Sequence, residues 1–342
     1  MIISRTPFRM SFFGGGTDYH GWYNEEPGAV LATTIDKYCY ISCRYLPPFF
    51  EHKSRLIYSK MEHVNKSIDE IDHPSIRETL RYMNIHEGIE IHHDGDLPAR
   101  TGLGSSSSFT VGLLNSLYAL KGQIVTKEQL AKEAIHIEQN MIKENVGCQD
   151  QTLAAYGGFN HVEFGGANHL KVQPLTIPLN KLYKLQNHLM LFFTGFSRTA
   201  SHIAEHQIKN IPKKKVELRR MYEMVNQAID ILNGEDINAF GKLLDESWQL
   251  KRSLSEKVST SQIDDLYDTA MKAGALGGKL LGAGGGGFVL IFAEPERQAH
   301  VRAALKTLLE VPIRFENLGS QIIVYQPDQG HAYVERRINA AR

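Results

Sequence analysis

The residues best suited to bind a charged ligand form one short run before the middle of the chain. Leu97–Ser108 reads Leu-Pro-Ala-Arg-Thr-Gly-Leu-Gly-Ser-Ser-Ser-Ser, and an apolar stretch follows it directly. Glycine allows close approach of the backbone to a ligand and positive φ angles. The start of a helix offers unpaired N–H groups to a phosphate. A turn with an ordinary serine cap is the alternative, but four consecutive serines exceed what capping requires. We therefore predict phosphate binding by Gly102, Leu103, Gly104, Ser105, Ser106 and Ser107.

This run differs from two common nucleotide-binding motifs. The pattern GxxxxGK[ST] of the P-loop occurs nowhere in the sequence. Gly282-x-Gly284-x-x-Gly287 does match the dinucleotide pattern GxGxxG, but it leads into Phe288–Ala293, which has the composition of a strand. The dinucleotide motif must open a helix, so we reject a Rossmann fold.

Two carboxylates stand near each other in sequence and could serve the same site. Glu138 falls within the apolar stripe of a helix that the capping box Thr126-x-x-Gln129 opens. A carboxylate on an apolar face is costly unless it is paired or binds a metal. Asp150 lies in Gly147–Gln151, which we expect to be a loop. Each acid alone is best explained as a salt-bridge partner. Beside a phosphate-binding run, however, the two match a Mg²⁺ ligand and a general base for phosphoryl transfer to a hydroxyl.

The surrounding pattern predicts two α+β halves that position these residues. In the first half we expect strands at Val30–Ile35, Tyr38–Tyr45 and Gly88–His93, helices at Ser105–Leu120 and from Thr126 to about Lys143, and a hairpin of Phe159–Phe164 with Leu170–Leu175. In the second half we expect strands at Leu189–Thr194, Phe288–Ala293 and Gln321–Tyr325, and helices near Lys213–Asn233, Asp236–Ser253, Ser261–Ala273 and Glu294–Leu309. The best candidate boundary between the halves is Thr176–Gln186.

Composition restricts the class of protein. The chain of 342 residues carries 38 Lys+Arg and 38 Asp+Glu, with 42% hydrophobic residues, which is ordinary for a globular protein. Balanced charge gives no bulk electrostatic reason to bind nucleic acid or an anionic membrane. The three cysteines form no CxxC pair and fit a reducing compartment. No secretory signal and no apolar run of membrane length is evident. We expect a cytoplasmic protein with small-molecule ligands and without nucleic-acid or membrane partners, and a homo-oligomer stays open.

Three segments together carry a resemblance to a known family. They are Arg5–Tyr19, which contains Gly14-Gly15-Gly16-Thr17-Asp18, the run Pro98–Ser108, and Lys279–Gly287. In this order and spacing the segments resemble those of the GHMP family of small-molecule kinases, over nearly the whole chain. The resemblance implies an α+β, two-domain GHMP kinase fold, with an N-terminal domain like ribosomal protein S5 domain 2 at 1–180 and a ferredoxin-like C-terminal domain at 181–342.

The resemblance also implies roles for individual residues. ATP would place its phosphates on the Gly102–Ser107 run, and Mg²⁺ would be held by Ser106 and Glu138. Asp150 would be the catalytic base, and Arg9 would stabilise the attacking or leaving oxygen. Ligand-binding residues on the acceptor side would be Gly15, Gly16, Thr17, Asp18, Gly285 and Gly286, with the Gly282–Gly287 run closing over the site.

A departure within the first segment bears on the acceptor. Galactokinase-like members carry Gly-Glu-His-Thr-Asp-Tyr, whereas this chain reads Gly14-Gly15-Gly16-Thr17-Asp18-Tyr19. The loss of the Glu and His removes two hydroxyl partners and puts galactose in doubt. The segment instead resembles the D-glycero-D-manno-heptose 7-phosphate kinases, which phosphorylate the anomeric hydroxyl on the way to nucleotide-activated heptose for bacterial surface polysaccharide.

A phosphorylated sugar would need a second anion site. Thr194–Ser201 follows a predicted strand and opens a helix, and it contains Ser197 and Arg198. A helix N-terminus with a guanidinium suits a phosphate monoester, and N-capping beside a surface arginine explains the segment equally well. Two other functions stay open, namely a kinase of an unphosphorylated sugar such as fucose or galactose, and a non-catalytic sugar and ATP sensor.

Overall fold

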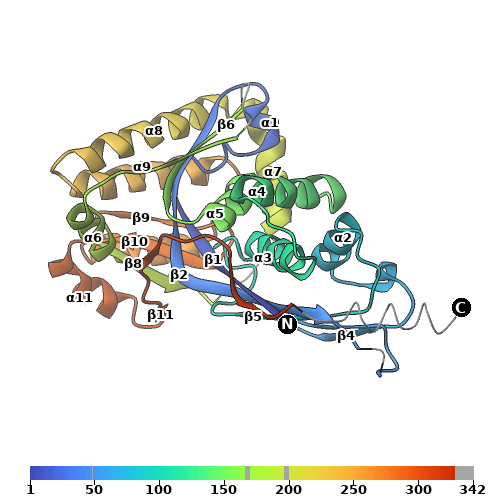
Figure 1. The fold of residues 1–342 in the computed structure, drawn as a ribbon. Coiled ribbons are helices and arrows are strands. Elements are labelled where there is room, and N and C mark those ends of the chain that lie inside the picture. Colours follow the sequence, from blue (N-terminus) through green and yellow to red (C-terminus); the bar gives the residue numbers. More distant parts are fainter. Residues whose placement is uncertain (48, 166–169, 196–199, 328–342) are drawn as a thin grey trace, which may run out of the picture.

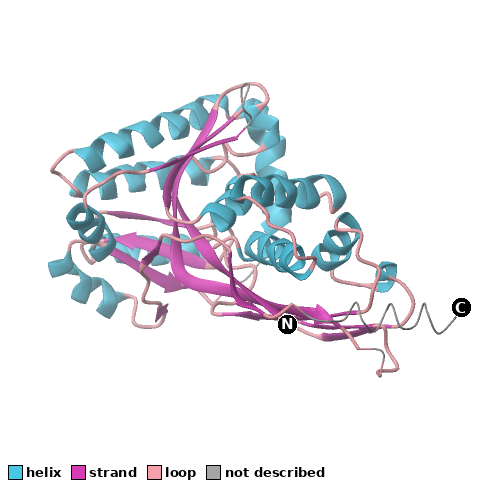
Figure 2. Ribbon diagram, viewed as in Figure 1, coloured by secondary structure: helices cyan, strands magenta, loops and turns pink. Residues whose placement is uncertain are grey.

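The computed structural model describes residues 1–47, 49–165, 170–195 and 200–327, and contains two β-sheets with helices packed on them (Figures 1 and 2). In the described residues, the larger sheet has nine strands, and its longest path runs in the order β13-β1-β2-β5-β3-β4. The smaller sheet has four strands in the order β11-β8-β10-β9. No helix in the described ranges is both long and apolar enough to cross a lipid bilayer.

Two long antiparallel strands form the frame of the larger sheet. They are β1 (Ile2–Phe13) and β2 (Gly28–Tyr45). We predicted two separate strands in the second of these, but the structure has one strand whose halves pair with different neighbours. Its first half pairs with β6 (Phe159–Phe164) and its second half with β5 (Ile89–Gly95). The pairing with β1 shifts between Pro7 and Phe8, so Asp36 and Lys37 form an irregularity instead of a turn.

The remaining elements of the first half agree closely with the sequence pattern. Helix α3 (Ser105–Leu120) begins and ends at the predicted residues, and β6 with β7 (Leu170–Pro174) forms the predicted hairpin. Thr126 caps α4 (Lys127–His136), because its side chain accepts a hydrogen bond from the N–H of Gln129. The other elements here are α1 (His20–Tyr23), β3 (Ser54–Ile57), β4 (Met61–Val64), α2 (Pro74–Tyr82), α5 (Gln149–Tyr156) and α6 (Leu179–Asn187).

The predicted helix to Lys143 does not run straight to its end. After His136 it continues as a π-helical turn over Ile137–Met141, and Lys143 has a φ of 63° that no right-handed helix allows. A π-helical turn widens a helix by one residue and is often found at functional sites. Here it carries Glu138.

The second half supplies the smaller sheet and most of the long helices. Its elements are β8 (Leu189–Phe193), α7 (Ala200–Asn210), α8 (Lys215–Asn233), α9 (Asn238–Ser253), α10 (Ser261–Lys272), β9 (Gly277–Leu280), β10 (Phe288–Phe292), α11 (Pro295–Ala304) and β11 (Leu309–Glu310). The chain then returns to the larger sheet, where β12 (Phe315–Glu316) pairs with β2 and β13 (Gln321–Tyr325) pairs with β1. A single cut between 180 and 181 therefore does not separate the two sheets.

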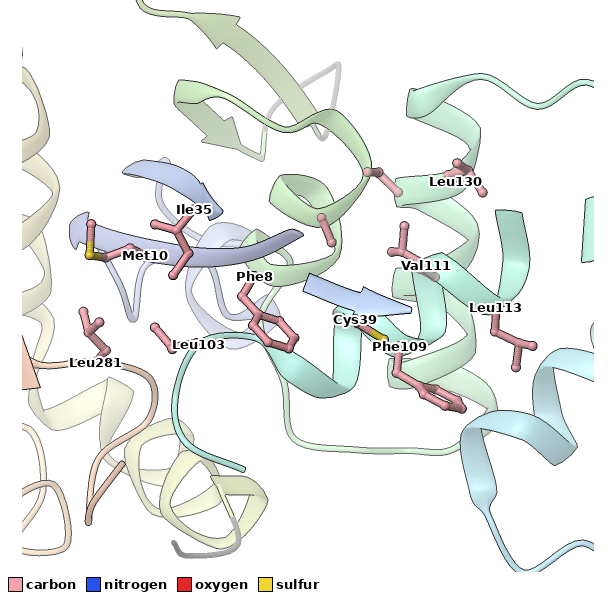
Figure 3. Packing of buried hydrophobic residues seen from close by; sticks show 14 of the residues in the cluster. Phe8, Met10, Ile35, Cys39, Leu103, Phe109, Val111, Leu113, Leu130 and Leu281 are labelled. Atoms are coloured by element: carbon pink, nitrogen blue, oxygen red, sulfur yellow. The ribbon is translucent and has the colours of Figure 1, made fainter. Parts of the chain in front are cut away.

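One continuous hydrophobic core links the two halves. Phe13 at the end of β1 packs edge-on against Phe240 of α9, with ring centroids 5.0 Å apart. The same core holds Leu103 of the predicted phosphate run and Leu281, which follows β9, and Figure 3 shows both near Met10 of β1. The apolar side chains on either side of the predicted site are thus fixed against each other, which places the polar residues between them.

The packing of α3 on the larger sheet tolerates no side chain at Gly112. A Cβ atom there would lie 2.7 Å from Thr6 Oγ1 and 3.3 Å from Ser4 Oγ, both on β1. We expect Gly112→Val to lower the free energy of unfolding by about 1–3 kcal/mol, because the helix must move off the sheet. Urea denaturation measures the effect. Gly234→Ala is the control, since its φ is −78° and an added methyl would make only ordinary contacts. Equal unfolding midpoints for the two variants would contradict this packing argument.

Candidate active site

The predicted phosphate run forms a turn that leads directly into α3. Gly102 and Gly104 have φ angles of 85° and 74°, in a region that side chains disfavour. Gly104 occupies the N-cap position of α3, and no side chain caps the helix. The backbone N–H groups of its first turn are therefore left for a ligand. Ser105 and Ser106 line a cleft together with both glycines, and Ser106 is exposed.

The backbones of two glycine runs are in direct contact, namely Gly102–Gly104 in this turn and Gly282–Gly287 after β9. A Cβ atom on Gly102 would lie 2.3 Å from the carbonyl oxygen of Leu281, and one on Gly282 would lie 2.4 Å from the Cα of Gly102. The second run reaches the cleft through Gly282 and Ala283. The structure does not bring the predicted Gly285 and Gly286 to the cleft lining, and the N–H of Gly285 instead donates to Val258 O at 2.9 Å.

Arg9 and Asp150 form a bidentate ion pair on one wall of the cleft. Arg9 Nε and Nη2 donate to the two Asp150 carboxylate oxygens, each at 2.8 Å, and Nη1 donates to the carbonyl oxygen of Gly102 at 2.6 Å. Asp150 lies in the first turn of α5 and not in a loop as we predicted, because the helix starts at Gln149. A guanidinium has five N–H donors, so Arg9 keeps two for a ligand.

Glu138 lies next to Ser107 of the predicted phosphate-binding run, and only 1% of its surface is exposed. It accepts a hydrogen bond from Ser107 Oγ at 2.8 Å and another from Gln151 Nε2. Burial raises the pKa of Glu138 to about 7, although hydrogen bonds from Thr110, Ser107 and Gln151 oppose the shift. Its Oε1 atom is buried without a partner among the described residues. Ser106 and Glu138 were predicted to hold Mg²⁺ together, and the serine that is hydrogen-bonded to Glu138 is Ser107, the neighbour of Ser106.

These oxygens fit a Mg²⁺ ion that also binds phosphate. Glu138 Oε1 and Gln151 Oε1 are both buried without a hydrogen-bond partner in the described residues, and carboxylate and amide oxygens are ligands that Mg²⁺ accepts. No group of three or more His, Cys, Asp and Glu side chains in the described ranges could hold a metal ion. Mg²⁺ commonly binds through one or two protein oxygens and completes its shell with water and phosphate.

Asp18 also lines the cleft and is only 2% exposed. Its Oδ1 accepts from the N–H of Gly16 at 2.9 Å, and burial, with a smaller contribution from the nearby charge of Asp150, raises its pKa. Gly15 and Gly16 line the cleft beside it. Thr17 does not, because its hydroxyl is buried and donates to the carbonyl oxygens of Gly14 and Ala29.

Two buried lysines in the cleft were missed from the sequence. Lys251 and Lys279 are 7% and 2% exposed, and both line the cleft with Arg9, Asp18 and Asp150. The signal for Lys251 was its place on the buried face of α9, where Phe240, Leu244, Ser247 and Trp248 also lie. A cation on an apolar helix face is as unusual as the carboxylate at Glu138 that we did notice. The predicted anion-site residues Ser197 and Arg198 lie outside the described residues.

Family models match both halves of the chain. The N-terminal domain of GHMP kinases matches residues 72–158, and the C-terminal domain of GHMP kinases matches residues 217–311. The chain belongs to the GHMP kinase family. The match confirms the family predicted from the three sequence segments and the two-domain α+β fold that it implies.

Relatives of this GHMP kinase act on different acceptors. It is 28% identical to a D-glycero-alpha-D-manno-heptose 7-phosphate kinase from Campylobacter jejuni, over 89% of this chain and 93% of that protein. It is also 26% identical to a galactokinase from Pyrococcus furiosus, over 89% of this chain and 92% of that one. A crystal structure of a D-glycero-D-manno-heptose 1-phosphate kinase from Bacteroides thetaiotaomicron has the same fold, with a TM-score of 0.77 and 23% identity over 95% of this chain and all of that one.

The contact between the glycine runs generates a testable prediction. We expect Gly102→Ala in this GHMP kinase to weaken ATP binding at least tenfold and to lower the melting temperature, because a methyl group would collide with Leu281 O and the residue would be strained at a φ of 85°. Calorimetric titration with ATP and thermal melting measure the two effects. Gly234→Ala again serves as the control. Wild-type affinity in Gly102→Ala would show that the turn does not bind phosphate in the described conformation.

Proposed function

We propose that this kinase transfers the γ-phosphoryl group of ATP to the anomeric hydroxyl of D-glycero-α-D-manno-heptose 7-phosphate and so forms the 1,7-bisphosphate. This step would serve nucleotide-activated heptose synthesis for bacterial surface polysaccharide. The observation that carries the proposal is the arrangement of Arg9, Asp150 and Asp18 around one cleft beside the phosphate turn. The similarity to the Campylobacter heptose 7-phosphate kinase over nearly the whole chain supports the choice of acceptor.

The proposed reaction uses Asp150 as the general base. A carboxylate oxygen of Asp150 accepts the proton of the sugar O1–H while O1 forms a bond to the γ-phosphorus. The bond from the γ-phosphorus to the bridging oxygen breaks, and that oxygen leaves as part of ADP. Arg9 holds the carboxylate in a fixed orientation through two hydrogen bonds and faces the transferring group with its remaining donors.

Substrate positions follow from which groups line the cleft. The phosphates of ATP would bind the first turn of α3, and the sugar hydroxyls would be held by Asp18 beside Gly15 and Gly16. Glu138 would hold Mg²⁺ together with a serine hydroxyl of the turn and Gln151, and the ion would neutralise charge on the phosphates. The small residue at Gly15 leaves room where galactokinase-like members carry a glutamate.

A kinase of an unphosphorylated sugar is the second candidate. The galactokinase from Pyrococcus furiosus matches this chain over the same 89% as the Campylobacter enzyme, at a similar identity. An ADP-release assay with Mg·ATP and a panel of heptose 7-phosphate, sedoheptulose 7-phosphate, mannose 6-phosphate, fucose and galactose separates the two. Turnover confined to heptose 7-phosphate is the expected result, and turnover of a neutral sugar would favour the second candidate. ATP binding without ADP release from any acceptor would indicate a sensor.

We expect Asp150→Asn to lower kcat by about 10²–10⁴-fold, because the amide cannot accept the proton of the acceptor hydroxyl. The affinity for ATP should change little, since the nucleotide phosphates are assigned to the turn before α3. Single-turnover kinetics and nucleotide titration measure the two quantities. Asp268→Asn, at an exposed position on α10, is the matched control. Near wild-type kcat in Asp150→Asn would show that another group accepts the proton.

We expect Glu138→Gln to raise the Mg²⁺ concentration needed for half-maximal activity by about tenfold or more, because the neutral amide is a weaker ligand. The substitution preserves the shape of the side chain, so thermal stability should stay close to that of the wild type. A Mg²⁺ titration at saturating ATP and acceptor measures the change. Glu128→Gln on the exposed face of α4 is the control. An unaltered Mg²⁺ requirement would place the metal elsewhere.

A further inference from the structure

A lysine from the second half of the chain lies in the cleft and forms no ion pair with any residue that the structure describes. Lys251 projects from the last turn of α9 and lines the cleft with Arg9, Asp18 and Asp150. Its Nζ donates to the carbonyl oxygens of Leu280, at 2.9 Å, and Gly282. These are the hydrogen-bond partners of the amine within the described ranges, and neither carries a formal charge. An ammonium has three donors, so one remains for a ligand.

The position of Lys251 mirrors that of Arg9 across the contact between the glycine runs. Arg9 donates to the carbonyl oxygen of Gly102, and Lys251 donates to that of Gly282, the residue packed against Gly102. The two cations are therefore hydrogen-bonded to the two glycines that form one backbone contact. They differ in charge balance, because Arg9 is paired with Asp150 in a bidentate geometry and Lys251 is not paired.

Hydrogen bonding to two carbonyls does not account for a lysine at this position. A neutral side chain could donate hydrogen bonds to these carbonyl oxygens. Burial of an ammonium group has a large desolvation cost unless an anion compensates its charge. The anions that face Lys251 are Asp18 and Asp150, and the cations that face it are Arg9 and Lys279. Arg9 already forms an ion pair with Asp150, so a bound phosphate oxygen would supply the anionic partner that the two carbonyl oxygens do not give Lys251.

We propose that Lys251 is a phosphate-binding residue of this site and that its free N–H donor contacts a phosphate oxygen of the bound substrates. Two phosphates could supply that oxygen, the γ-phosphate of ATP and the phosphate already carried by the acceptor. The first source needs only the kinase activity of the family. The second rests on the proposed function, because it requires a phosphorylated acceptor.

The contact between Lys251 and a phosphate should make the affinity for that phosphate depend on pH. Burial, with a smaller contribution from the charge of Arg9, lowers the pKa of Lys251 to about 7 in the free protein. A phosphate oxygen favours the ammonium form and raises the pKa again in the complex. Between these two pKa values, binding must take up a proton. The affinity for the phosphate should therefore be greatest below pH 7 and fall as the pH rises above it.

The experiment compares Lys251→Met in the full chain with Lys242→Met, which removes an exposed lysine from the same helix. Calorimetric titrations with Mg·AMP-PNP and with Mg·ADP test the γ-phosphate, at pH 8 in two buffers of different ionisation enthalpy. Values of KM for heptose 7-phosphate and for unphosphorylated heptose test the acceptor phosphate. Thermal melting reports on the fold.

If Lys251 contacts the γ-phosphate, Lys251→Met should bind AMP-PNP about tenfold to a hundredfold more weakly while its affinity for ADP stays unchanged. If it contacts the acceptor phosphate, KM should rise by a similar factor for heptose 7-phosphate alone. In either case the proton uptake of the wild type should disappear in Lys251→Met and persist in Lys242→Met.

Other outcomes overturn the proposal. Unchanged AMP-PNP affinity together with an unchanged KM would show that no phosphate contacts Lys251. An equal loss of affinity for AMP-PNP and for ADP, together with a lower melting temperature, would show that Lys251 has only a structural role, namely its hydrogen bond from α9 to Gly282. Failure of the wild type to use heptose 7-phosphate would refute the proposed acceptor, and the comparison of AMP-PNP with ADP would still decide the role of Lys251.

Discussion

The structure of this site depends on one backbone contact that only glycine permits. Gly102 and Gly282 approach so closely that a methyl group on either would collide with the main chain of the other run. The contact joins a turn of the larger sheet to a loop of the smaller one, and the apolar side chains of Leu103 and Leu281 flank it within one core. The carbonyl oxygens of these two glycines accept hydrogen bonds from Arg9 and Lys251. The contact therefore also positions these two cationic side chains relative to each other.

Burial of charge is the second constraint, and it explains why the site is poised for an anion. Burial raises the pKa values of Asp18 and Glu138, and it lowers those of Lys251 and Lys279. Each of these shifts means that the protein alone stabilises the charged form poorly. In the proposed complex, phosphate groups would compensate the lysines and Mg²⁺ would compensate the carboxylate of Glu138.

Local sequence signals predicted the parts of the site that reside in one segment. Ser105–Leu120 was predicted to the residue, because glycine turns and an apolar helical period define its two ends. Pairings between distant segments were not predictable in the same way. The hydrogen bond from Ser107 to Glu138 joins two helices, and the sequence did not reveal the π-helical turn that carries Glu138. The position of Asp150 within α5 depends on where that helix starts. Lys251 was missed because its neighbours in space, Leu280 and Gly282, are about thirty residues away in sequence.

The connectivity of the chain and the shared core limit how the two sheets can move relative to each other. β12 and β13 return from the second half to pair with β2 and β1, so the smaller sheet is joined to the larger one at both ends of its sequence. A rigid-body separation of the two sheets would expose the core where Phe13 packs against Phe240. The proposed contact of Lys251 with a phosphate would therefore form at a junction held by this core, because Lys251 is hydrogen-bonded to Gly282 and Gly282 packs against Gly102.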